Sequence, residues 1–153
     1  MPAKPFVLAD AGLARLSHVS LQVREIEPAL DFYRTIFGMQ VILDQTLEGA
    51  DFDAVTATPR ARSRMIRGLI AGQAVVQLFW HSWREATETH QTLMSFEVRD
   101  AAAAHRLLEG EGVACQSPPV EFDNSWAFVL HDLDGHPIEI IQWKPDFQPY
   151  RAS

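Results

Sequence analysis

The sequence predicts an α+β fold in which two βαβββ modules pair into a half-open barrel. The main observation is a repeat: LSHVSLQV at 16–23 and TLMSFEV at 92–98 each precede a helical segment, and VVQLFW at 75–80 is matched by PIEIIQ at 137–142. The chain has 153 residues, 47% of them hydrophobic, which is enough to bury the core of one domain. We therefore expect residues 1–153 to form a single domain that arose by duplication.

The first module is expected at residues 15–80. Its opening segment alternates, with Val19, Leu21 and Val23 on an apolar face and His18, Ser20 and Gln22 on a polar face, as in a half-buried strand. A helix follows, with Pro28 in its first turn and Gly38 at its end. The remaining segments are predicted as a strand at 39–43, a long polar loop at 44–63, and strands at 64–71 and 74–80.

The second module is expected at residues 92–145 and repeats this order. Asp100 is a suitable N-cap for a helix that ends at Gly110 or Gly112. The strands of this module are predicted at 92–98, 113–116, 126–131 and 137–143, with a tight turn at 133–136. The polar residues 81–91 are interpreted as a linker, and residues 146–153 as a tail.

A four-stranded sheet with its helix on one side buries only one face. The simplest partner for the other face is the second copy of the same unit, so we expect the two polar faces to line a cleft with the helices outside. Aligning the repeats pairs His18 with Leu93 and Gln77 with Glu139. Since these positions have diverged, they are candidates for chemistry on a small molecule.

Composition excludes several classes of protein. The formal charge is −7, with 20 acidic and 13 basic residues, so the electrostatic attraction that drives nucleic-acid binding is missing. No apolar run is long enough to span a bilayer, and the single Cys115 cannot form an internal disulfide. We expect a cytoplasmic protein without a nucleic-acid or membrane partner.

Three motifs carry a resemblance to a known family: HVSLQV in the first strand, FYRTIFGMQV at the helix end, and HDLDGHPIEII before and within the last strand. Together they resemble the vicinal oxygen chelate superfamily, which includes glyoxalase I, methylmalonyl-CoA epimerase, extradiol dioxygenases, and fosfomycin and bleomycin resistance proteins. The resemblance implies a glyoxalase-like fold, a small-molecule substrate or ligand, and a homodimer. It also implies a divalent metal ion, for which the matching positions are His18, Gln77 and Glu139.

Leu93 departs from the family pattern, which commonly has a second histidine at this position. A leucine cannot coordinate a cation, so the implied ligands are one imidazole, one amide oxygen and one carboxylate. Such a set is expected to bind Ni, Co, Mn, Zn or Fe weakly. A site that holds no metal is an equally consistent expectation. The loss of this histidine disfavours dioxygenase chemistry, and His90 could replace it only through a bulge or a loop.

Four residues are candidates for contact with the substrate. Trp126 and Phe79 are expected to line an apolar pocket, Leu93 to border it, and Arg67 to meet a carboxylate or phosphate. Aromatic residues in strands more often belong simply to the core. For Arg67, a position at an exposed edge is an equally consistent interpretation.

Three functions remain open. The first is a metal-assisted isomerase, epimerase or lyase in which His18, Gln77 and Glu139 surround a carbonyl group. The second is an enzyme without a metal that uses His18 and Glu139 as an acid/base pair. The third is a ligand-sequestering protein similar to the bleomycin resistance branch.

Overall fold

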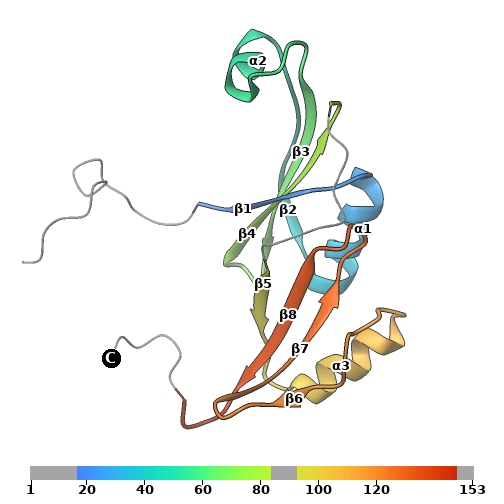
Figure 1. Cartoon of the computed structure of the whole chain (residues 1–153), viewed down its shortest axis with the longest axis vertical. Coiled ribbons are helices and arrows are strands. Elements are labelled where there is room, and N and C mark those ends of the chain that lie inside the picture. The colour runs from blue at the N-terminus through green and yellow to red at the C-terminus, as the bar shows by residue number, and fades with distance from the viewer. Residues whose placement is uncertain (1–16, 84–92, 148–153) are drawn as a thin grey trace, which may run out of the picture.

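Two four-stranded sheets, one from each module, form the framework of the protein (Figure 1). The structure is a computed structural model that describes residues 17–83 and 93–147. The strand order is β1-β4-β3-β2 in the first sheet and β5-β8-β7-β6 in the second. The α+β class and the division into two modules are therefore confirmed, and neither sheet closes into a barrel.

The elements of the first module are β1 (Val19–Gln22), α1 (Ile26–Phe37), β2 (Gln40–Glu48), α2 (Ala50–Thr56), β3 (Arg62–Ile70) and β4 (Ala74–His81). Those of the second are β5 (Met94–Glu97), α3 (Ala101–Gly110), β6 (Val120–Glu121), β7 (Ser125–His131) and β8 (Pro137–Trp143). None of the helices in the described part of the chain is long and apolar enough to cross a membrane. The predicted linker at 81–91 and tail at 146–153 fall largely outside the described residues.

The strand register is equivalent in the two modules. In the first sheet β1 runs parallel to β4 and places Ser20 beside Gln77. In the second sheet β5 runs parallel to β8 and places Ser95 beside Glu139. Each module therefore pairs its first strand with its last and sets a serine next to the polar residue of the last strand.

Both predicted helix ends are confirmed. Gly38 adopts a left-handed conformation (φ 62°) that favours glycine and ends α1. Asp100 caps α3, since its side chain accepts a hydrogen bond from the Ala103 backbone N–H at 2.9 Å.

The prediction of a long loop at 44–63 was wrong. Strand β2 continues to Glu48, and the short helix α2 follows it. This segment has no regular hydrophobic period, so the sequence gives little sign of the helix. Its return to β3 is instead fixed by Asp53, whose carboxylate accepts the backbone N–H groups of Arg60 and Ala61, each at 2.8 Å.

The strand predicted at 113–116 is reduced to a single bridge between Cys115 and Leu130. The edge position in the second sheet is taken by β6, which pairs Val120 with Ala127. Two consecutive prolines, 118 and 119, precede β6, and proline has no N–H to donate to a strand ladder. They limit this edge to a two-residue strand.

The apolar faces of both sheets contribute to one hydrophobic core. Residues from every layer are almost completely buried in it: Leu21, Val23, Tyr33, Ile66, Leu78, Leu130, Ile138 and Ile140. Helix α1 of the first module contacts the second module, because the ring centroids of Phe37 in α1 and Phe96 in β5 lie 4.8 Å apart. The two modules therefore share one hydrophobic core, to which α1 contributes.

A buried carboxylate, that of Asp132, makes a specific contact between the modules. Its Oδ2 accepts hydrogen bonds from the Tyr33 hydroxyl of α1 and from Nδ1 of His136, both at 2.7 Å. Its Oδ1 accepts the backbone N–H groups of Asp134 and His136. Burial opposes ionisation of Asp132, but the hydrogen bonds from His136 and Tyr33 outweigh it and hold the pKa below its usual value.

The pKa of Tyr33 is shifted in the opposite direction to that of Asp132. Burial, together with the negative charge of Asp132, raises the pKa of the Tyr33 hydroxyl, so this group stays protonated and donates. We call this group of bonds around Asp132 the Asp132 contact.

We expect the Asp132 contact to make the fold sensitive to acid. The pKa of Asp132 is lower in the folded protein than in the unfolded chain, where an aspartate has a pKa of about 3.9. The stability it confers is therefore present above about pH 4 and lost as the pH falls through the lowered value. Tyr33→Phe should lower the free energy of unfolding by about 2 kcal/mol at neutral pH, measured by urea denaturation.

The matched control is Asp31→Asn, which removes an exposed carboxylate from the same helix that carries Tyr33. Asp132→Asn should flatten the loss of stability between neutral and acid pH, while Asp31→Asn should leave the slope close to that of the wild type. Equal slopes for the two variants would contradict the role given to Asp132.

Candidate functional site

A polar cluster centred on Gln77 occupies the face of the first sheet that points away from the core. Gln77 is only 3% exposed. Arg67 of β3 lies directly opposite it and donates a hydrogen bond from Nε to Oε1 at 2.9 Å. The amide nitrogen of Gln77 donates to Ser20 Oγ at 3.0 Å and lies 3.4 Å from Nε2 of His18. We call this face, with His18, Ser20, Arg67 and Gln77, the first polar face.

Arg67 fixes the orientation of the Gln77 amide. A guanidinium group can only donate hydrogen bonds, so the amide oxygen must face Arg67 and the NH₂ group must face His18. The His18 Nε2 atom is then the acceptor. The other ring nitrogen, Nδ1, lies 2.9 Å from Ser17 Oγ and carries the proton in this tautomer.

The second sheet has a corresponding but acidic cluster. Ser95 Oγ donates to Glu139 Oε1 at 2.7 Å, which repeats the serine contact of the first module. Glu97 lies on the same side of β5, two residues beyond Ser95. Leu93 precedes β5 and is 46% exposed. We call this face, with Ser95, Glu97 and Glu139, the second polar face.

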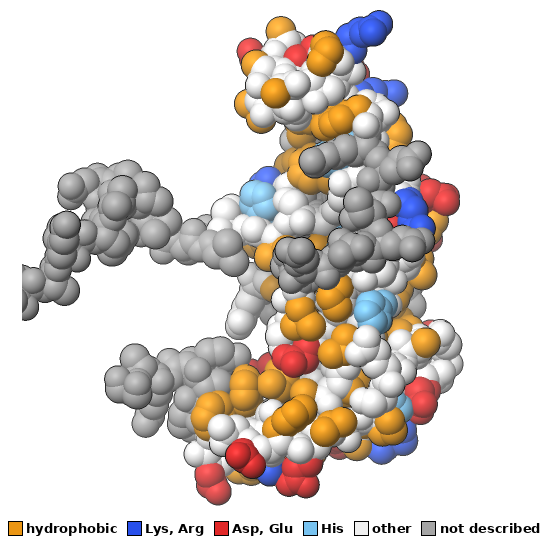
Figure 2. Space-filling view, viewed as in Figure 1, with side chains coloured by type: hydrophobic (Ala, Val, Ile, Leu, Met, Phe, Trp, Pro, Cys, Tyr) orange, Lys and Arg blue, Asp and Glu red, His pale blue; other side chains and the backbone are white. Residues whose placement is uncertain are grey.

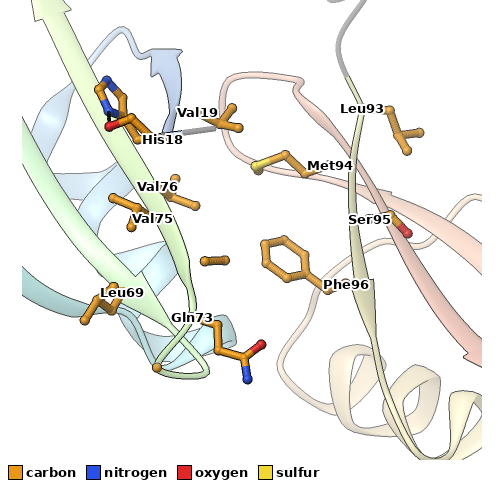
Figure 3. A pocket seen from close by; sticks show the side chains of 13 residues that line it. His18, Val19, Leu69, Gln73, Val75, Val76, Leu93, Met94, Ser95 and Phe96 are labelled. Carbon is orange, nitrogen blue, oxygen red and sulfur yellow. Dashed lines mark hydrogen bonds between the residues drawn. The ribbon is translucent and has the colours of Figure 1, made fainter. Parts of the chain in front are cut away.

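The structure does not bring the two polar faces together within one copy of the chain. Figure 3 shows His18 on the side of the first sheet away from β5, whereas Ser95 points away from the first sheet. Between them lies a pocket of about 580 Å³, into which Val19, Met94 and Phe96 project. His18 and Gln77 are therefore neighbours, and Glu139 belongs to the opposite side.

The surroundings of Gln77 are unfavourable for the metal ion that the sequence resemblance implies. The Gln77 oxygen is occupied by the cationic Arg67, and a guanidinium group opposes a divalent cation beside it. In the described part of the chain no group of three or more His, Cys, Asp or Glu residues could hold a metal ion. The predicted ligands of one copy therefore do not fit a three-ligand metal site.

The two aromatic candidates occupy different environments. Phe79 lies on the first polar face, two residues beyond Gln77, and its ring stacks on His81 with centroids 5.1 Å apart. Trp126 lies on the helix-covered face of the second sheet, packed against the core, with Lys144 Nζ 5.1 Å from its ring centroid. Only Phe79 is positioned to contact a ligand on the first polar face.

Two serines belong to these clusters but were not among the candidates for chemistry predicted from the sequence. Ser20 and Ser95 occupy equivalent positions in the repeats and bond the polar residues of the last strands, Gln77 and Glu139. The alignment of the repeats contains this signal, because both positions are serine while their neighbours differ.

Charge differs between the two halves of the molecule. On the side seen in Figure 2, acidic side chains gather over the second module, and most Lys and Arg side chains lie over the first. The two polar faces follow the same division, with His18 and Arg67 on one and Glu97 and Glu139 on the other.

The sequence matches one family description, Glyoxalase/Bleomycin resistance protein/Dioxygenase superfamily, over residues 15–140. No curated protein matches the chain. Among solved structures, a glyoxalase family protein from Bacillus cereus is similar with a TM-score of 0.73 and 16% sequence identity, and the match covers 94% of this chain and 98% of that chain.

Two further solved structures are similar. A glyoxylase/bleomycin resistance protein/dioxygenase domain from Frankia sp. EAN1pec has a TM-score of 0.68 at 20% identity, covering 88% of this chain and 96% of that chain. The fosfomycin resistance protein FosX from Listeria monocytogenes has a TM-score of 0.65 at 16% identity, covering 88% and 97%. At these identities the similarity establishes the fold.

Proposed function

The chain belongs to the glyoxalase/bleomycin resistance protein/dioxygenase superfamily, and we propose that within it the protein is an enzyme that moves a proton on a small molecule bound over the first polar face. The observation that carries this proposal is the orientation of His18. Its Nε2 atom is an acceptor beside the Gln77 amide, so this nitrogen has a lone pair with which to take a proton. Isomerase, epimerase and lyase reactions that begin next to a carbonyl group use such a step.

We propose further that a second copy of the chain completes the site. The first polar face carries His18 and Arg67, and the second carries Glu97 and Glu139, so the two faces have opposite charge. Pairing the first face of one copy with the second face of another is electrostatically favourable and, by two-fold symmetry, forms two equivalent sites. Glu139 of one copy then lies across from His18 of the other.

In this arrangement His18 and Glu139 act as an acid/base pair. One group takes a proton from the carbon next to a carbonyl, and the other returns a proton to complete the reaction. Ser95 holds the Glu139 carboxylate through its 2.7 Å hydrogen bond, as Gln77 holds the imidazole. Both groups are thus oriented by neighbours from their own sheets.

A metal-assisted version of the same reaction is the second candidate. It is favoured by the FosX protein, which was crystallised with manganese(II) together with a dihydroxypropylphosphonic acid or with sulfate. Here His18 Nε2 of one copy and Glu139 of the other are the donors for such an ion, which when bound polarises a carbonyl. The amide oxygen of Gln77 could be a third donor only if its hydrogen bond with Arg67 were broken.

The proposed proton transfer predicts exchange of carbon-bound hydrogen with solvent. In D₂O, NMR should detect deuterium incorporation next to the carbonyl in some members of a panel of 2-oxo acids, 2-hydroxy aldehydes and acyl thioesters. His18→Ala and Glu139→Gln should each slow this exchange about a hundredfold or more. The control is Glu121→Gln, which removes another carboxylate from the second sheet and should leave the rate unchanged.

Chelation separates the two candidates. Exchange that survives EDTA supports the acid/base pair alone, and exchange that requires added Mn²⁺ or Zn²⁺ supports the metal-assisted version. Tight binding of panel compounds with no exchange would refute both and indicate a sequestering protein.

Leu93→His should raise the affinity for divalent metal ions. It adds an imidazole beside the second polar face, at the position where the family commonly has a metal ligand, so Zn²⁺ and Mn²⁺ should bind at least about tenfold more tightly by titration calorimetry. The control is Ile42→His, at a strand position that is 53% exposed. An equal increase in metal affinity for the two variants would show that any added surface histidine binds the metal. That result would contradict the location proposed for the site.

A further inference from the structure

Three arginines on strand β3 differ in their partners. Arg62 pairs with Glu48 at 3.5 Å. Arg64 pairs with Asp44 at 2.9 Å and also with Glu27. Arg67 is the exception, because its bond is to the neutral amide of Gln77. Within residues 17–83 and 93–147, no carboxylate lies within ion-pair distance of the Arg67 guanidinium.

Arg67 is also partly buried, in a strand between Ile66 and Gly68. A cation that has lost part of its hydration without gaining a counter-charge is unfavourable. The bond to Gln77 uses Nε, and the described residues supply no partner to the two terminal nitrogens. These nitrogens form a planar pair of donors that matches the two oxygens of a carboxylate or a phosphate group.

A second, independent observation lies on the same face. The side-chain nitrogen of Gln22 is buried and has no hydrogen-bond partner among the described residues. Gln22 lies two residues beyond Ser20 and pairs with Phe79 in the strand register. The first polar face therefore has a further donor without a partner among the described residues, next to the apolar ring of Phe79.

We propose that Arg67 is the receptor for an anionic group of the substrate, a carboxylate or a phosphate or phosphonate, and that Gln77 is a positioning residue that holds the guanidinium group toward it. The substrate is then an organic anion whose apolar part lies along Phe79. This inference rests on the proposed function for the statement that the bound anion is a substrate. The presence of the anion site itself depends only on Arg67 and its surroundings.

Binding of small probe anions tests the proposal without any assay of activity. Phenylacetate and phenylphosphonate are titrated into the full-length protein, with phenylacetamide as the neutral probe, and dissociation constants are measured by NMR or calorimetry. Both anions should bind more tightly than the amide. Arg67→Met should weaken anion binding at least about tenfold, the size expected for a charge-assisted pair of hydrogen bonds.

The matched control is Arg62→Met, which removes one positive charge from the same strand. It should change anion binding by less than about twofold, because long-range attraction between exposed charges is screened. Gln77→Glu is a sharper variant: it gives Arg67 a carboxylate partner, so it should abolish anion binding while the protein stays folded, as thermal unfolding reports. Gln77→Leu should weaken binding by releasing the guanidinium group.

Each outcome decides the proposal. Equal binding of phenylacetamide, no binding of either anion, or equal losses in Arg62→Met and Arg67→Met would overturn it. A preference between the two anions identifies the group that Arg67 accepts. Where Arg67→Met does not fold, Arg67→Lys replaces it: it keeps the charge but not the planar pair of donors, and it should bind the anions more weakly than the wild type.

The two proposals fail separately. Glu139→Gln should retain anion binding, since Glu139 is not part of the receptor. Anion binding without any hydrogen exchange would refute the proposed enzyme and leave the Arg67 site intact. Exchange on uncharged substrates that is unaffected by Arg67→Met would leave the proposed enzyme intact and refute Arg67 as the receptor of the substrate.

Discussion

The buried carboxylate of Asp132 joins the two modules through hydrogen bonds. It accepts hydrogen bonds from Tyr33 in the first module and from His136 in its own turn, and the apolar faces of both sheets pack beside it. Packing the apolar faces inward forces the polar faces outward, because alternate residues of a strand point to opposite sides. His18 and Glu139 lie on these polar faces, so they are separated within one copy of the chain.

The two repeated modules therefore carry polar faces that differ in charge. Each has a serine bonded to the polar residue of its last strand, but one is built around an imidazole and a guanidinium group and the other around carboxylates. Among the described residues, no acid lies on the face with Arg67, whereas the face with Glu139 supplies one. Opposite charges on two faces of one protein favour association of copies, so the proposed site, its acid/base pair and the anion receptor have a common origin.

Much of this arrangement could be predicted from the sequence. The alternation at 16–23 assigned His18 and Ser20 to the polar face, and the repeat placed Gln77 and Glu139 at equivalent positions, because period and repeat are local properties of a chain. The helix α2 and the edge strand β6 were not predicted, since the first depends on hydrogen bonds to Asp53 and the second on two prolines. The bond between Tyr33 and Asp132 joins residues 99 positions apart, and no local pattern indicates such a pair.

The most direct test of this account mixes two inactive variants. His18→Ala and Glu139→Gln are unfolded together in equal amounts, refolded, and assayed for exchange of carbon-bound hydrogen. If each site takes His18 from one copy and Glu139 from another, half of the dimers are mixed and each mixed dimer has one intact site. Activity should then return to about a quarter of the wild-type rate. If both residues act within one chain, every site keeps a defect, and an inactive mixture would contradict the account.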